Sequence, residues 1–265
     1  MPAEGPPAAS VVIPTHNRLG ELVEVIAAVQ RQVTEVAAAV EVVVVDDGSG
    51  DGTGAWLEAQ ARCGRLRALG QPNAGPARAR NAGVRAAKGE LILFLGDDTV
   101  PRPGWLREHL ETHRVVGGHQ LAVLGYTTFP PSVDSPFRRF INEWGAQFGY
   151  LLLETAAQVP FNFFYTSNIS LRRRVLLDLG GFREDFPAAA WEDIELAYRA
   201  VAGGLEILYQ PRARVLHHHR VQLATFCHRQ RTSGRSAAIF ARLHPELGGF
   251  LGFERMRRRG PADRV

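Results

Sequence analysis

Short β-branched runs alternate with segments of helical periodicity over the first hundred residues. The run EVVVV (41–45) is apolar on both faces, which is typical of a central strand in a parallel sheet. From Leu19 to Val33, apolar residues instead recur at helical spacing, as on the buried face of a helix. The pattern predicts strands at 10–14, 41–45, 66–70 and 90–95, and helices at 19–33, 53–62 and 75–87.

This order of elements predicts the fold class. Strand and helix alternate regularly, and right-handed crossovers place such helices on both faces of a sheet. We therefore expect an α/β protein with a mainly parallel, Rossmann-like sheet between helices. In sheets of this kind ligands bind beyond the carboxyl ends of the strands.

The second half of the chain is less regular. Glycine, aromatic and β-branched residues at 115–131 predict a hairpin, and 135–153 is rich in aromatic residues without a clear period. Further along, the pattern predicts strands at 162–171, 205–210 and 213–217, and helices at 172–179, 191–203 and 221–243, followed by a basic tail.

Composition narrows the class only a little. The 265 residues are 45% hydrophobic and 22% charged, as in ordinary globular proteins, and the net charge of +4 is mildly basic. Basicity suits an anionic ligand, nucleic acid or an acidic membrane surface, but no nucleic-acid-binding module is recognisable. The first ten residues lack the features of a signal peptide, and no apolar stretch is long enough to span a bilayer. We expect a cytoplasmic protein.

Polar residues follow three of the predicted strands, and the parallel topology brings these strand ends to one rim. The four carboxylates among them repel one another, so they need hydrogen-bond donors or a cation. A hard divalent ion such as Mg²⁺ or Mn²⁺, which bridges carboxylate to phosphate, is the natural partner. The residues concerned are Pro14, Thr15, Asn17, Arg18, Asp46, Asp47, Asp97 and Asp98.

Two further motifs allow more than one interpretation. WEDIEL (191–196) is either an acidic first turn stabilised by the helix dipole or a source of catalytic carboxylates. VLHHHR (215–220) follows the last predicted strand, where a histidine is either a surface or core residue or a metal ligand.

Four segments carry recognisable motifs: SVVIPTHNR, EVVVVDDGSGDGT, NAGPARARNAGVRAAKGELILFLGDDTVPRPGWL and WEDIELAYRA. In this order they resemble family-2 glycosyltransferases of the GT-A fold. The resemblance runs from Ser10 to about His217, and it carries no information about the sugar.

The resemblance implies a role for most of these residues. Asp98 is implied to bind a divalent metal, with His217 completing the metal sphere and His219 as the alternative. Gly96 departs from the family pattern, which usually has an acid there, so Asp97 is implied to orient the ribose or the metal waters. The implied nucleotide-sugar contacts are Pro14, Thr15, Asn17, Arg18, Asp46, which reads the base, Asp47, Arg80 and Asp97.

The resemblance also implies a reaction. Asp193 is the implied general base and Glu192 a supporting or acceptor-binding acid, in a single displacement that inverts the anomeric centre. Aromatic residues of the second half are candidates for stacking on sugar rings: Trp144, Phe148, Phe163, Phe164, Tyr165 and Trp191.

The expected organisation is one compact unit with four parts. These are a disordered leader (1–9), a nucleotide-sugar-binding half (10–114), an acceptor-binding and catalytic half (115–217), and a C-terminal helix with a basic tail (218–265). The basic C-terminal part is either a solvated covering helix or a contact with the inner face of a membrane.

The expected function is metal-dependent, inverting transfer of a sugar from a nucleotide-diphosphate sugar to a hydroxyl of a glycan, lipid-linked or small-molecule acceptor. The alternative is a catalytically inactive nucleotide-sugar or glycan-binding protein of the same fold. A sugar-nucleotide pyrophosphorylase is disfavoured because PTHNR follows the first strand in place of a glycine-rich loop. A processive synthase is disfavoured because membrane helices and a Gln-x-x-Arg-Trp motif are missing.

Overall fold

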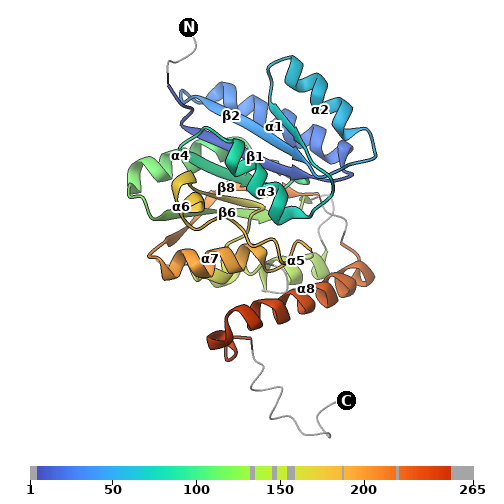
Figure 1. The fold of residues 1–265 in the computed structure, drawn as a ribbon, viewed down its shortest axis with the longest axis vertical. Helices are drawn as coiled ribbons and strands as arrows, with labels where there is room; N and C mark the ends of the chain where they lie inside the picture. Colours follow the sequence, from blue (N-terminus) through green and yellow to red (C-terminus); the bar gives the residue numbers. More distant parts are fainter. Residues whose placement is uncertain are drawn as a thin grey trace, which may run out of the picture.

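The computed structural model describes residues 5–131, 135–144, 148–153, 159–186, 188–218 and 221–251. Helices pack on both faces of a central sheet, as expected from the alternating pattern, and α8 lies across one end of the molecule (Figure 1). The helices are α1 (Leu19–Glu35), α2 (Thr53–Arg62), α3 (Pro76–Ala86), α4 (Trp105–Val116), α5 (Pro136–Glu143), α6 (Arg173–Asp178), α7 (Glu192–Ala202) and α8 (Leu223–Leu243).

The sheet has eight strands in the order β3-β2-β1-β4-β7-β6-β8-β5. Strands β3, β2, β1 and β4 are parallel, β7 is antiparallel to both β4 and β6, and β5 is antiparallel to β8. The strands are β1 (Ala9–Thr15), β2 (Val40–Asp46), β3 (Arg67–Gly70), β4 (Leu91–Leu95), β5 (Thr99–Pro101), β6 (Leu121–Thr128), β7 (Asn168–Arg172) and β8 (Glu206–His217).

Two hydrophobic clusters form the core, one on each face of the sheet. Alternate residues of one strand point to opposite faces, so Val12 joins one cluster and Val11 the other. The first cluster contains side chains of α3, α6 and α7, and the second contains side chains of α1 and α4, including the fully buried Trp105. The apolar runs at 42–45 and 91–95 are buried on both sides for this reason.

The elements predicted for the first half are present with small shifts of their ends, whereas three predictions for the second half are wrong. The hairpin predicted at 115–131 is one strand, β6, whose partners β7 and β8 are distant in the sequence. The strand predicted at 162–171 begins only at Asn168, after the 3₁₀ turn Phe161–Phe163. The strands predicted at 205–210 and 213–217 are the single strand β8, interrupted by a register shift opposite Gly125 and Tyr126.

Some features lie outside these predictions. Helices α4 and α5 and the short strand β5 have no counterpart among them. Strand β1 begins at Ala9, the last residue of the expected leader, and the basic segment at 254–259 and His219 lie outside the described residues. No helix in the described part of the chain is long and apolar enough to cross a bilayer.

Candidate active site

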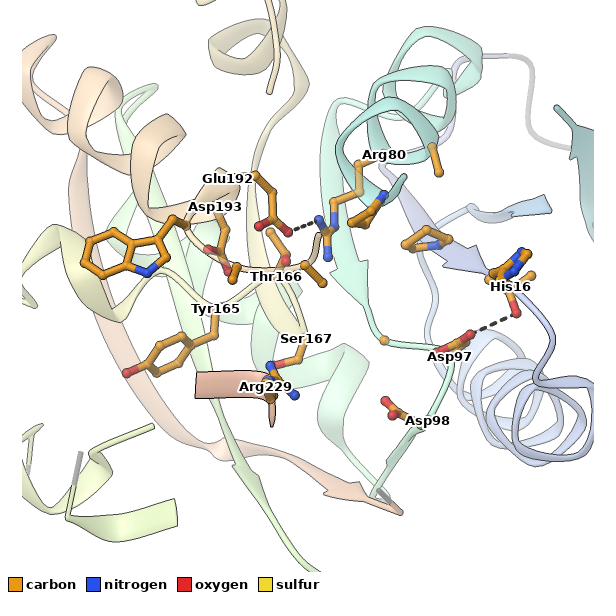
Figure 2. Close-up of a pocket in the computed structure, with 18 of the residues that line it drawn as sticks. His16, Arg80, Asp97, Asp98, Tyr165, Thr166, Ser167, Glu192, Asp193 and Arg229 are labelled. Carbon is orange, nitrogen blue, oxygen red and sulfur yellow. Dashed lines mark hydrogen bonds and ion pairs between the residues drawn. The ribbon is translucent and has the colours of Figure 1, made fainter. Parts of the chain in front are cut away.

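A cavity of about 480 Å³ opens where the carboxyl ends of β1, β2 and β4 meet. The N-terminal end of α7 and the middle of α8 close it from the other side, as the labelled side chains show (Figure 2). The parallel register explains the convergence, because Thr15 of β1 lies opposite Asp46 of β2. The cavity therefore lies at the sheet edge that the topology predicts for a ligand.

The two acids after β4 face the cation of Arg18 and the hydroxyl of Thr15 across this rim. The hydroxyl of Thr15 donates to Asp97 Oδ2 at 2.9 Å, and Arg18 Nη1 donates to Asp97 Oδ1 at 3.1 Å. Arg18 also contacts Asp98, so one guanidinium bridges both carboxylates. Burial raises the pKa of Asp97 to about 6, although the charge of Arg18 opposes that shift.

Pairing between β5 and β8 brings a histidine to the same acids. Thr99 lies opposite His217, which places His217 Nε2 at 3.3 Å from Asp98 Oδ2. Two ligands on adjacent corners of a sphere with bonds of roughly 2.1 Å lie about 3 Å apart, so this pair fits a divalent ion. In the described part of the chain no group of three or more His, Cys, Asp or Glu side chains is arranged to hold a metal ion, so phosphate oxygens and water would complete the sphere around this pair.

Gly96 leaves little room beside Asp98. A Cβ at this position would lie 3.1 Å from Thr99 Oγ1 and 3.2 Å from Asp98 Oδ1. Its backbone N–H donates to the carbonyl of Ser167 at 3.3 Å, and Ser167 lines the cavity. The acid usual in the family would therefore press on Asp98 in this chain.

The residues after β2 mostly organise the loops around them. Asp47 lines the cavity and accepts hydrogen bonds from the backbone of Ala74 and Gly75 at 2.9 and 2.8 Å. Asp46 accepts from the Ser49 backbone at 2.9 Å. Asn17, at a φ of 52°, accepts from the backbone of Gly50 at 2.7 Å. Of the expected donor contacts, Pro14, Thr15, Arg18, Asp47, Arg80 and Asp97 line the cavity, whereas Asn17 and Asp46 lie outside its wall.

A second acidic pair occupies the opposite wall. The chain enters α7 at Trp191, whose φ of 72° is in the left-handed region, and Glu192 and Asp193 follow at the first turn. Arg80 of α3 donates to Glu192 Oε1 at 2.7 Å, and this ion pair is almost completely buried. Burial and the charge of Glu192 raise the pKa of Asp193 to about 7, while Arg80 opposes the shift.

The expected aromatic contacts divide into two groups. Phe148, Tyr165 and Trp191 line the cavity, whereas Phe163 and Phe164 belong to the core and Trp144 is 69% exposed. Sequence reasoning did not assign several residues of the wall, which are His16, Thr166, Ser167, Arg229, Gln230 and Ser233. His16 lies in the segment PTHNR, whereas the segments of the others carry no motif that singles them out.

Comparison with known sequences identifies relatives. Residues 10–180 match the profile described as "Glycosyl transferase family 2". A pre-mycofactocin glycosyltransferase of Mycobacterium tuberculosis is 30% identical over 249 residues, which cover 89% of this chain and 48% of the relative. A validoxylamine A glucosyltransferase of Streptomyces hygroscopicus subsp. jinggangensis is 32% identical over 227 residues, covering 75% and 52%. The chain spans about half the length of these curated relatives.

Solved structures share the fold. A mannosyltransferase from Pyrobaculum calidifontis, in complex with GDP-Man and Mn²⁺, has a TM-score of 0.63 and 21% identity, covering 88% of this chain and 63% of that chain. S. aureus TarS 1–349 has a TM-score of 0.56 and 23% identity, covering 77% and 60%. The strand order and the family match agree with the resemblance seen in the sequence motifs. The chain belongs to glycosyl transferase family 2 and has a GT-A-type α/β fold.

Proposed function

We propose that this chain is the catalytic part of a metal-dependent, inverting glycosyltransferase that moves a sugar from a nucleotide-diphosphate sugar to a hydroxyl group. One observation carries the proposal. A single cavity has Asp98 and His217, a pair whose chemistry suits a divalent ion, on one wall and a partly buried carboxyl with a raised pKa, Asp193, on the other. This separation suits a leaving group on one side and an attacking hydroxyl on the other.

The donor is proposed to lie over the carboxyl ends of β1, β2 and β4. Pro14, Thr15, Asp47 and Asp97 line this part of the cavity, whereas Asn17 and Asp46 are proposed to shape the loops that receive the nucleotide. A divalent cation held by Asp98 and His217 would neutralise charge on the leaving diphosphate. Two neighbours in the same fold were solved with GDP-Man and Mn²⁺ and with UDP, which supports a donor of this class.

The proposed chemistry at the opposite wall belongs to Asp193. Its carboxylate takes the proton of the acceptor hydroxyl as that oxygen attacks the anomeric carbon. The bond from the anomeric carbon to the phosphate oxygen breaks, and its electron pair leaves on the diphosphate. Attack from the side opposite to the leaving group inverts the anomeric centre. The raised pKa of Asp193 suits a base that works near neutral pH.

The two halves of the chain divide the work in this proposal. Residues 10–114 hold the donor, and residues 115–217 provide the base and the acceptor side, with α8 as an extension over the cavity. The relatives include a succinoglycan biosynthesis protein of Rhizobium meliloti, 33% identical over 223 residues, besides the glucosyltransferase for validoxylamine A. Glycan, lipid-linked and small-molecule acceptors are all consistent with an open cavity of this size.

The test separates donor binding from transfer. Thermal unfolding is measured with UDP, GDP and dTDP and their sugar conjugates, with and without Mn²⁺, because a ligand at about 100 times its Kd stabilises the fold by about 2.7 kcal/mol. Slow hydrolysis of the bound sugar nucleotide then reports chemistry with water as the acceptor. Asp193→Asn should keep binding and lose hydrolysis, whereas Asp178→Asn, an exposed acid on α6, should keep both.

Two results would contradict the proposal. If the wild-type chain binds none of the nucleotides, the proposed donor site is refuted. Tight binding without turnover by the wild-type chain, with any acceptor class, would favour the non-catalytic binding protein.

A further inference from the structure

Helix α8 is fixed to the rest of the molecule at both ends. At its start, Gln222 and Thr225 form a capping box, and the ring of Phe226 packs 5.6 Å from that of Phe137 on α5. Near its end, Phe240 is fully buried and packs 5.2 Å from Trp191. Because both ends are anchored, the middle of the helix keeps a defined position.

That middle section lies over the cavity. Ser233 accepts a hydrogen bond from Trp191 Nε1 at 3.0 Å, next to the acidic pair of α7. Arg229 lies one helical turn earlier on the same face, and it lines the cavity together with Ser233. Figure 2 shows Arg229 among the side chains that line the cavity, as Tyr165, Ser167 and Asp98 also do.

Arg229 differs from the other two arginines of the cavity in its pairing. Arg18 is paired with Asp97 and Asp98, and Arg80 is paired with Glu192. Arg229 has no ion-pair or hydrogen-bond partner among the residues that the structure describes, although it is one of three arginines in the wall. A diphosphate entering a cavity lined by this many carboxylates needs cations that are not already neutralised.

We propose that Arg229 of α8 binds the phosphate oxygens of the donor diphosphate from the side opposite to β4. This proposal rests on the function proposed above. It adds a donor-binding residue from α8, which lies after the strands and motifs that predicted the donor site. Arg229 lines the same cavity as the Asp98–His217 pair and the Asp193 carboxyl, and the leaving group is proposed to separate from the sugar within this cavity. A guanidinium offers paired donors that match phosphate oxygens, and it keeps its charge at every working pH.

The proposal predicts a contact with the second phosphate that is lost on truncation. Titration calorimetry measures the affinity for UDP, GDP and dTDP and for the corresponding monophosphates, all in Mn²⁺. Arg229→Ala should weaken binding of the preferred diphosphate by roughly tenfold or more, the cost expected for a charge-assisted hydrogen bond, and weaken the monophosphate much less. Arg229→Lys should recover part of the loss. The matched control is Arg235→Ala, an exposed arginine of α8 outside the cavity, which should change neither affinity.

Three outcomes would overturn the assignment, and they differ in what else they remove. Equal diphosphate affinity in wild type and Arg229→Ala overturns the role of Arg229 and leaves the donor site standing. The same result with a raised KM for the acceptor places Arg229 on the acceptor side instead. If the wild-type chain binds none of the nucleotides, the proposed function fails together with this inference.

Discussion

Truncation of Arg80 tests whether the acidic wall of the cavity depends on one guanidinium. Arg80→Ala removes the buried partner of Glu192 and leaves two neighbouring carboxyls, Glu192 and Asp193, without a cation beside them. Arg78, two residues earlier on α3, is the matched control. Arg78 pairs with Glu184 at 3.0 Å, but the two side chains are 57% and 38% exposed.

The two substitutions should differ greatly in cost. Breaking a buried pair leaves an uncompensated charge and typically costs about 3–5 kcal/mol, whereas an exposed pair contributes about 0–1 kcal/mol. Arg80 also lies over the ring of Phe182, with 5.6 Å between the guanidinium carbon and the ring centroid, which adds to its loss. We therefore expect Arg80→Ala to lower the free energy of unfolding by at least about 2 kcal/mol more than Arg78→Ala does.

The cost should also depend on pH. Arg80 holds down the pKa of Asp193, so without it this pKa rises further above the ordinary value of 3.8. A carboxyl whose pKa is raised by folding contributes favourably below its unfolded pKa, and this contribution is lost as pH rises through the folded pKa. The difference between Arg80→Ala and wild type should therefore be larger at pH 8 than at pH 5.

Urea unfolding followed by tryptophan fluorescence measures these differences, because Trp191 adjoins Glu192. The reasoning is refuted if both variants lose the same stability within about 0.5 kcal/mol, a margin usual for surface substitutions. It is also refuted if the loss in Arg80→Ala is the same at pH 5 and pH 8.

Three more predictions concern the cavity. If Asp193 is the base, kcat/KM of the wild type should fall about tenfold per pH unit below pH 7. Asp193→Asn should raise the unfolding temperature at pH 8 by a few degrees but not at pH 4, because it removes a charge that folding disfavours. Asp98→Asn or His217→Ala should weaken Mn²⁺ binding in the presence of a nucleoside diphosphate at least tenfold, measured by electron paramagnetic resonance, and an unchanged affinity would exclude the pair as ligands. Gly96→Ala should weaken Mn²⁺ binding in the same assay, because its Cβ would crowd Asp98, and a neutral result would contradict that contact.

The sequence was most informative where an apolar run in the sequence corresponds to a strand that is buried on both faces. The strands β1, β2 and β4 are apolar on both faces because both faces carry helices, so their positions could be predicted. The polar residues after them could be assigned to one rim because parallel strands end on the same side. The family motifs added the expected roles of Asp98, Glu192 and Asp193.

The second half was harder because its strands pair with distant partners. Nothing local distinguishes β6 from one arm of a hairpin, since its neighbours β7 and β8 follow more than forty residues later. The register shift in β8 likewise gives one strand the pattern of two. The ion pair of Arg80 and Glu192 also has no local signal, because the two residues are 112 positions apart in the sequence.

The sequence by itself determined the α/β layout, the family and the carboxylates that surface at the strand ends, because these depend on periodicity and on short motifs. Only the tertiary structure decided which charges meet. Arg18 contacts both Asp97 and Asp98, and Asp46 and Asn17 lie outside the cavity wall. The tertiary structure also brought Arg229 over the site, because the direction of a residue on an amphipathic helix depends on where both ends of that helix are anchored.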